Sequence, residues 1–114
     1  MHEVYLEQVL ALVEAVPAGS VTTYGDVAAM VGLGGPRQVG AVMARHGSGV
    51  PWWRVVRADG RPAQGHVEEA LDRLEAEGVP VIDGRVRMAP ARWRPGAEEV
   101  SEHLLRAEVR PDRR

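Results

Sequence analysis

Arginine, a side chain well suited to binding phosphate, is concentrated in the middle of the sequence. Residues 37–61 contain five arginines and one aspartate, whereas residues 1–36 contain acidic residues and no arginine or lysine. Residues 84–94 add four arginines and no acidic residue. Although the formal net charge is −2, this distribution predicts a local basic surface on an acidic body, which is typical of nucleic-acid binding.

Side chains for covalent or metal chemistry are scarce. The sequence contains no cysteine, which removes disulfides, thiolate ligands and cysteine nucleophiles together. The four histidines are too widely spaced to form a helical ligand pair, and no nucleophile–base spacing is recognisable. They are His2, His46, His66 and His103. We therefore expect no metal, no cofactor and no catalytic residue.

Length and composition indicate a small soluble protein. The chain has 114 residues, of which 45% are hydrophobic and 26% charged, as in ordinary globular domains. No apolar run approaches the roughly 20 residues that a membrane span needs, and the N-terminal residues do not resemble a signal peptide. We expect a cytoplasmic, nucleoid-associated monomer that does not bind membranes.

Hydrophobic spacing predicts three helices in the first half of the chain. Residues 4–16 place Leu6, Val9, Leu10 and Val13 on one face. A second helix starts at Thr23, whose hydroxyl can cap it while Asp26 completes a capping box, and stops at Gly32. After a Gly34–Gly35 turn, a third helix runs from Pro36 to Arg45. Two short helices joined by a glycine turn predict a helix-turn-helix, with an outer face made of Arg37, Gln38, Ala41, Ala44 and Arg45.

The second half of the chain predicts one more helix and a hairpin. Residues 47–49 are glycine-rich and suggest a flexible loop. A helix is expected over Val67–Glu77, closed by Gly78, and a hairpin over residues 79–88 with a type I′ turn at Asp83-Gly84. The expected fold is therefore mainly α with a small β-hairpin.

The sequence divides at about residue 94. Residues 1–94 contain the periodic segments, and residues 95–114 begin with Pro-Gly. A solvated extension is the favoured interpretation of the second part. The alternative is a short helix around Val100, Leu104 and Leu105.

Four ordered motifs carry a family resemblance. VTTYGDVA, GPRQVGAVMARH, VPWWRVV and LEAEGVPV together resemble the DNA-binding domain of O6-alkylguanine-DNA alkyltransferases over about residues 3–94. The third motif reads PCHRV in those enzymes, and its cysteine accepts the alkyl group. Trp52 stands at the cysteine position, as in the alkyltransferase-like proteins, which usually read PWHRV. The resemblance implies a winged-helix-like DNA-binding domain that flips O6-alkylguanine from the minor groove without removing the alkyl group. It also implies a hand-over of the site to nucleotide excision repair proteins.

The resemblance also implies roles for individual residues. Arg37 would fill the vacated stack, Tyr24 would rotate the nucleotide by crowding its 3′ phosphate, and Trp52 would pack on the extruded base. The implied lesion pocket comprises Tyr24, Val50, Pro51, Trp52, Trp53, Arg54 and Arg61. The implied DNA-binding residues are Thr23, Pro36, Arg37, Gln38, Gly40, Ala41, Ala44 and Arg45.

Plainer interpretations of these residues remain open. Arg37 can be a simple phosphate contact, and Tyr24 and Trp52 can fill the core. The small residues Gly40, Ala41 and Ala44 would let the helix backbone approach the DNA, but they also suit close helix packing.

Two positions depart from the family pattern. Trp53 replaces the histidine of PWHRV, which relays a proton in the cysteine enzymes, so we expect different packing behind the pocket. The loop that follows is shorter than in relatives, some of which carry a basic residue there near the flipped base. Arg61 is our candidate for that position.

Two other classes of function stay open on sequence alone. An ordinary helix-turn-helix regulator would bind one DNA sequence in the major groove and ignore alkylation. An enzyme using Tyr24 or a carboxylate is the less favoured alternative, because no acid–base pair supports it.

Overall fold

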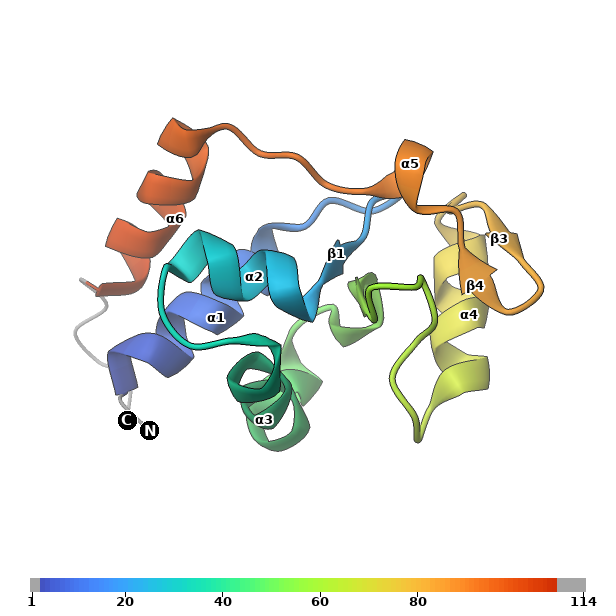
Figure 1. Cartoon of the computed structure of the whole chain (residues 1–114), viewed down its shortest axis with the longest axis horizontal. Coiled ribbons are helices and arrows are strands. Elements are labelled where there is room, and N and C mark those ends of the chain that lie inside the picture. Colours follow the sequence, from blue (N-terminus) through green and yellow to red (C-terminus); the bar gives the residue numbers. More distant parts are fainter. Residues whose placement is uncertain (1–2, 109–114) are drawn as a thin grey trace.

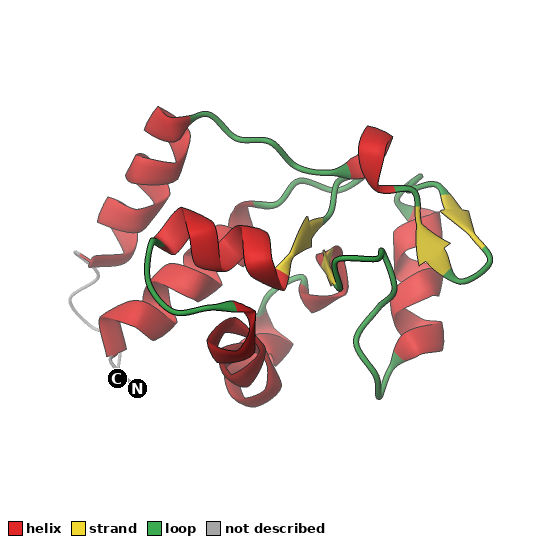
Figure 2. Ribbon diagram, viewed as in Figure 1, coloured by secondary structure: helices red, strands yellow, loops and turns green. Residues whose placement is uncertain are grey.

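The computed structural model describes residues 3–108, which fold mainly into helices with two small two-stranded sheets (Figure 1; Figure 2). This confirms the predicted fold class. None of the helices in the described residues is long and apolar enough to cross a membrane. In chain order the elements are α1 (Glu3–Ala15), β1 (Thr22–Thr23), α2 (Tyr24–Val31), α3 (Pro36–His46), the 3-10 turns η1 (Gly47–Gly49) and η2 (Trp52–Arg54), β2 (Val55–Val56), α4 (Val67–Ala76), β3 (Val81–Ile82), β4 (Arg85–Val86), α5 (Met88–Ala91) and α6 (Ala97–Glu108).

Helices α2 and α3 form the predicted helix-turn-helix pair. The Thr23 hydroxyl caps α2 by accepting a hydrogen bond from the backbone N–H of Asp26 at 3.0 Å. Gly32 ends the helix with φ 82°, a left-handed conformation that glycine adopts without steric cost. Pro36 then opens α3, where its fixed φ suits the first turn.

The predicted role of the Asp26 side chain is wrong. Instead of completing the cap, its carboxylate accepts two hydrogen bonds from Arg92, at 2.8 Å from Nε and 2.6 Å from Nη2. The two residues are 66 positions apart, so no local pattern announces the pair. The ion pair ties the segment after α5 to the start of α2.

Two clusters of buried side chains hold the fold together. The first lies between α1, α2, α3 and β2 and contains Val9, Leu12, Val13, Val27 and Val42, all fully or almost fully buried. The second lies under α4 and the hairpin and includes Val21, Val56, Leu74, Val79 and Val86. The β2 residues Val55 and Val56 point into different clusters, so this strand joins the two halves of the molecule.

A parallel strand pair, which the sequence did not predict, connects distant segments. β1 pairs with β2 so that Thr22 lies opposite Val55 and Thr23 opposite Val56. Because β1 leads directly into α2 and η2 leads directly into β2, this pairing brings Trp52 beside the start of α2. The arrangement of the candidate site therefore depends on four residues of strand.

The elements after β2 agree with most of the sequence-based expectations. Helix α4 lies within one residue of its predicted bounds. The hairpin joins two-residue strands, shorter than expected, through Asp83 and Gly84, whose φ angles of 54° and 77° fit the predicted type I′ turn. Before β2, one expectation differs from the structure: residues 47–49, which were expected to form a flexible loop, form the 3-10 turn η1.

The C-terminal segment is folded where the structure describes it. Helix α6 lies alongside α1 (Figure 1), with Val100 and Leu104 packed against the first cluster and Ala107 buried. The favoured interpretation, a solvated extension, is therefore wrong for residues 97–108, and the alternative of a short helix is correct. The rest of that prediction, residues 109–114, lies outside the described residues. The domain boundary near residue 94 stays a prediction.

Candidate nucleic-acid interface

The outer face of α3 is free of protein contacts that would bury it. Val39 and Val42 fill the core below, which turns the opposite face of the helix outward. All five residues predicted for that face are exposed, and so is Pro36. They are Arg37, Gln38, Ala41, Ala44 and Arg45.

This face carries positive charge that the protein does not neutralise. Within residues 3–108, neither Arg37 nor Arg45 forms an ion pair. The Gln38 side-chain oxygen accepts a hydrogen bond from the Gly35 N–H at 2.9 Å, which stabilises the start of α3. Gln38 as a whole is exposed, as are Arg37 and Arg45, so the face presents side-chain donors suited to phosphate.

A cavity of about 470 Å³ opens next to this face. Its volume lies in the range of ligand cavities, about 300–1,000 Å³. Helix α3, the start of α2, both 3-10 turns and the loop leading into α4 form its walls. The lining residues are Tyr24, Gly40, Met43, Ala44, Gly47, Ser48, Trp52, Trp53, Val55, Pro62, Ala63, Gln64, His66, Glu69 and Ala70. The structure thus brings together three predicted pocket residues, Tyr24, Trp52 and Trp53, with two residues predicted on the DNA-binding helix.

Two aromatic side chains shape the cavity wall. Tyr24, held at the first position of α2 by the Thr23 cap, is partly buried, and this burial raises the pKa of its phenol. Tyr24 therefore stays a neutral hydroxyl at physiological pH. Trp52 contacts the Trp53 ring edge-on, with centroids 5.7 Å apart and an interplanar angle of 87°. These aromatic rings make this part of the cavity wall apolar, with the Tyr24 hydroxyl as its polar group.

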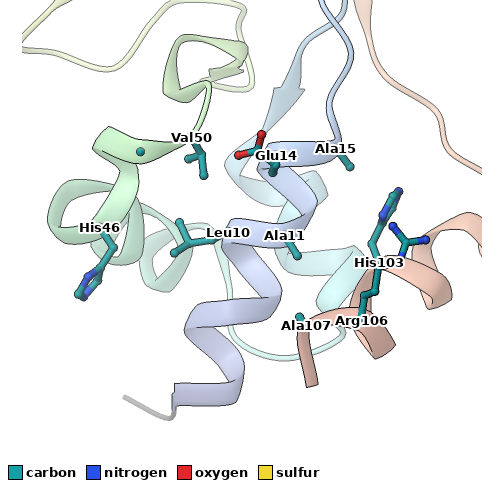
Figure 3. A pocket seen from close by; sticks show the side chains of 10 residues that line it. Leu10, Ala11, Glu14, Ala15, His46, Val50, His103, Arg106 and Ala107 are labelled. Carbon is teal, nitrogen blue, oxygen red and sulfur yellow. The ribbon is translucent and has the colours of Figure 1, made fainter. Parts of the chain in front are cut away.

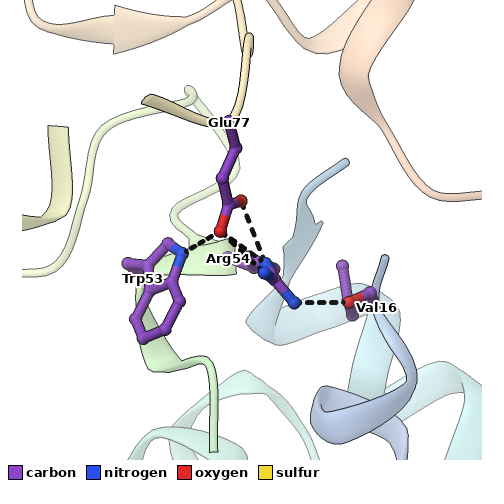
Figure 4. Close-up of polar contacts among 4 residues, drawn as sticks. All are labelled: Val16, Trp53, Arg54 and Glu77. Atoms are coloured by element: carbon purple, nitrogen blue, oxygen red, sulfur yellow. Dashed lines mark hydrogen bonds and ion pairs between the residues drawn. The ribbon is translucent and has the colours of Figure 1, made fainter. Parts of the chain in front are cut away.

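Behind the cavity, Glu77 binds Trp53 and Arg54 together (Figure 4). The Trp53 indole N–H donates to Glu77 Oε2 at 2.9 Å, and Arg54 Nη2 donates to the same oxygen at 2.6 Å. Arg54 Nη1 also donates to the Val16 carbonyl, at 2.9 Å, at the end of α1. Arg73 stacks over the Trp53 ring at 4.4 Å. Arg54 thus supports the pocket from behind by hydrogen bonds and does not line it. Trp53 both lines the cavity and takes part in the hydrogen bonds behind it.

These contacts fix the charge of Glu77. The hydrogen bond from Arg54 lowers the pKa of the Glu77 carboxyl, and the bond from Trp53 adds to the effect, although burial opposes both. Glu77 is therefore a carboxylate at neutral pH, and it accepts all the donors that converge on it.

Two predicted pocket residues adjoin the cavity without lining it. Pro51 is buried, and its carbonyl accepts the Arg54 N–H at 3.0 Å within η2. Val50 lines a different hollow, of about 590 Å³, which is formed by α1 and α6 together with the end of α3 and η1 (Figure 3). Although that hollow is larger, none of the tryptophans and no residue of the α3 outer face lines it, so we favour the smaller cavity as the functional one.

The structure does not bring Arg61 to the cavity. Its backbone N–H donates to Asp59 Oδ1 at 3.0 Å, and its side chain faces a shallow hollow beside the hairpin, with Arg85 and Arg87. The hydrogen bond from Arg61 lowers the pKa of the exposed Asp59 carboxyl, and the nearby Arg57, Arg61 and Arg85 charges add to this. Arg61 therefore belongs to an arginine cluster around the hairpin.

Sequence reasoning missed the wall that faces α3. This wall consists of residues from the loop after β2 and from the first turn of α4: Pro62, Ala63, Gln64, His66, Glu69 and Ala70. No spacing rule places this loop, because its position follows from the parallel β1–β2 pair and from the docking of α4. The hydrophobic spacing from Val67 onward predicted helix α4, but it did not predict that the first turn of this helix lines a cavity.

Comparison with known proteins assigns the family. Residues 5–79 match the model of the 6-O-methylguanine DNA methyltransferase DNA-binding domain. The chain belongs to this family. The matched segment of this methyltransferase-family domain runs from α1 to the end of α4 and contains every residue that lines the cavity. It confirms the resemblance that the four motifs carry.

The relatives of this chain include a base-flipping protein and an alkyltransferase-like protein. A DNA base-flipping protein of Vibrio parahaemolyticus serotype O3:K6 (strain AQ3810) is 34% identical over 97 residues, which cover 80% of this chain and 97% of the relative. Alkyltransferase-like protein 1 of Schizosaccharomyces pombe (strain 972 / ATCC 24843) is 33% identical over 83% of this chain and 98% of its own length.

A solved structure has the same fold. The crystal structure of S. pombe Atl1 in complex with damaged DNA containing O6-carboxymethylguanine superimposes with a TM-score of 0.71 at 30% identity. The match covers 83% of this chain and 99% of the Atl1 chain. The predicted roles of the individual site residues are not decided by this similarity.

Proposed function

We propose that this chain is a DNA-damage-recognition protein that binds duplex DNA containing O6-alkylguanine and rotates the lesion into the cavity beside α3. The observation that carries this proposal is the position of that cavity, which opens between an exposed basic helix face and two tryptophans. The names of the relatives, a base-flipping protein and an alkyltransferase-like protein, and the DNA complex of Atl1 support it.

Helix α3 is the element that enters the minor groove. Ala41 and Ala44 are exposed and Gly40 is partly exposed, so the helix backbone can approach the sugar–phosphate walls closely. Arg37 and Arg45 stand at the two ends of the helix, where they can reach phosphates on either side of the groove.

The flipped state requires compensation for lost stacking. Unstacking a base costs a few kcal/mol, and less for a damaged pair. Packing of the base against Trp52 returns about 1–3 kcal/mol, and Arg37 occupies the vacated position in the stack. Tyr24, which lines the cavity, crowds the phosphate next to the target nucleotide and favours its rotation.

The complex forms without alkyl transfer. Transfer needs a thiolate, and the sequence contains no cysteine. An indole carbon at Trp52 does not replace a thiolate at neutral pH, and the Trp53 N–H is engaged by Glu77. Because the lesion stays on the DNA, another activity must remove it. We assign that step to nucleotide excision repair proteins that recognise the bound, bent DNA.

A titration tests this function directly. Two duplexes of identical sequence, one with O6-methylguanine and one with guanine at the target position, are titrated with the protein. We expect tighter binding to the alkylated duplex, and a radiolabelled methyl group should remain on the DNA after incubation. Equal affinity for both duplexes, together with preference for one sequence, would support the regulator instead. Label on the protein would overturn the non-enzymatic mechanism.

A further inference from the structure

The wall of the cavity that faces α3 carries a histidine in contact with the base-packing tryptophan. His66 is the residue directly before α4, and it is exposed. Its ring lies 5.9 Å from the Trp52 ring, centroid to centroid, with an interplanar angle of 58°. A base packed on Trp52 would therefore have the imidazole beside it, at the open rim of the cavity.

Few other charged groups face this position. The walls from α3 and η1 contribute Gly40, Met43, Ala44, Gly47 and Ser48, which are all uncharged. Besides His66, the titratable lining residues are the neutral phenol of Tyr24 and the carboxylate of Glu69. Glu69 Oε2 accepts a hydrogen bond from Arg73 Nε at 3.2 Å along α4, so its charge is partly compensated. Among the residues that line the cavity, His66 is the basic one.

On the basis of the proposed function, we propose that His66 determines whether the cavity accepts an anionic alkyl group, such as a carboxymethyl adduct on O6. Protonation of the His66 imidazole makes this acceptance pH-dependent. A carboxylate has an ordinary pKa near 3.5, so the adduct stays negatively charged across the relevant range. The imidazole changes charge between about pH 5 and 8. As an imidazolium it donates a charge-assisted hydrogen bond to the adduct while resting against the Trp52 ring.

The direction of the effect follows from these charges. When His66 is protonated, an imidazolium faces the adduct carboxylate, and the attraction is present. When the imidazole is neutral, as is favoured at higher pH, the attraction is lost, and the carboxylate faces Tyr24 and the partly compensated Glu69. A neutral adduct of the same shape gains little at either pH, so the ratio of the two affinities isolates the contribution of His66.

The test uses three duplexes that differ at one base: O6-carboxymethylguanine, its uncharged amide isostere O6-carbamoylmethylguanine, and guanine. Dissociation constants are measured with the full chain at about pH 5.5 and about pH 8.0 at constant ionic strength. We expect the preference for the carboxymethyl over the carbamoyl adduct to be about threefold to tenfold greater at the lower pH. Changes elsewhere in the protein affect both duplexes alike and cancel in this ratio.

Three variants assign the effect. His66→Gln should remove the pH dependence of the ratio, and His66→Arg should make the preference for the carboxymethyl adduct equal at both pH values. His103→Gln, which changes a histidine of the hollow between α1 and α6, should behave as the unaltered chain. Both His66 variants alter an exposed side chain, so circular dichroism should show unchanged helix content.

Other outcomes overturn the inference in distinguishable ways. A ratio that does not change with pH, or one whose pH dependence persists in His66→Gln, removes the role of His66 and leaves the proposed function intact. If neither adduct binds more tightly than guanine, the proposed function fails and the inference fails with it.

Discussion

Arg37 is the residue whose role most needs a direct test, because a stack-filling arginine and a phosphate contact both contribute affinity. A fluorescent base analogue at the target position brightens when it leaves the stack. If Arg37 fills the vacated stack, Arg37→Ala should lower this signal more than it lowers overall binding, because a stack-filling side chain stabilises only the flipped state. The measurement is the fluorescence at saturating protein, set against the dissociation constant.

Arg45 provides the matched control for that experiment. It is exposed on the same helix face and, like Arg37, forms no ion pair within residues 3–108. Arg45→Ala should weaken binding while the saturated fluorescence stays high. Should Arg37→Ala behave in the same way as Arg45→Ala, Arg37 is one more phosphate contact.

Glu77 makes the second residue-scale prediction, which concerns stability and pH. The Glu77 and Arg54 side chains are only 15% and 16% exposed, and Glu77→Gln removes their ion pair. We expect a loss of about 1–3 kcal/mol in the free energy of unfolding at pH 7. The pKa of Glu77 is lowered from 4.5, so its contribution is present above pH 4.5 and is lost as the pH falls through the lower value of the folded protein.

The difference in the free energy of unfolding between the unaltered chain and Glu77→Gln should therefore decrease as the pH is lowered below 4.5, because a protonated glutamic acid resembles glutamine. Urea unfolding at several pH values measures this difference. Glu75→Gln, at an exposed position in the last turn of α4 shortly before Glu77, is the control and should change stability little at any pH. A gap between wild type and Glu77→Gln that stays constant down to low pH would contradict the assignment.

At the scale of elements, α6 stabilises the domain from outside the matched family segment. Leu104 packs against the first core cluster, whereas its neighbour Leu105 is 60% exposed. We expect Leu104→Ala to lower the free energy of unfolding by about 1–2 kcal/mol, below the range for fully buried leucines. The same truncation at Leu105 should cost less than about 0.5 kcal/mol.

Thermal or urea unfolding of the two adjacent variants separates a docked helix from a solvated one. No α6 residue lines the cavity beside α3, so both folded variants should bind O6-methylguanine duplexes as the unaltered chain does. Equal stability of the two variants would mean that α6 is not docked on α1 in solution.

At the scale of the whole molecule, the net charge is −2, but the outer face of α3 is locally basic because it carries Arg37 and Arg45. Neutralised phosphates release counterions, so the logarithm of the binding constant should fall linearly with the logarithm of salt concentration, with a slope of roughly −0.9 per phosphate contact. Arg45→Ala should reduce the slope by about 1 for alkylated and unmodified duplexes alike. Discrimination between them should not change with salt, because a methyl adduct adds no phosphate contact. A salt-dependent discrimination would place the recognition in the phosphate contacts instead.

The sequence alone determined the features that depend on neighbouring residues. The Thr23 cap, the stop at Gly32, the exposed face of α3 and the Asp83-Gly84 turn each follow from rules that act within about one helical turn or one hairpin. The lack of cysteine is likewise a property of composition. These local features were sufficient to predict the helix-turn-helix, whereas the family and its DNA-binding role were implied by the resemblance of the four ordered motifs.

Only the tertiary structure decided which distant residues share a site. The β1–β2 pair sets Trp52 beside Tyr24, and the docking of α4 brings Glu77 to Trp53 and Arg54. The same docking puts His66, and not Arg61, at the cavity. Such contacts depend on how the whole intervening chain packs, because a side chain's position is set by its element and the element's position by the buried core. Local periodicity carries no information about that packing, which is why the walls of the cavity had to be seen in three dimensions.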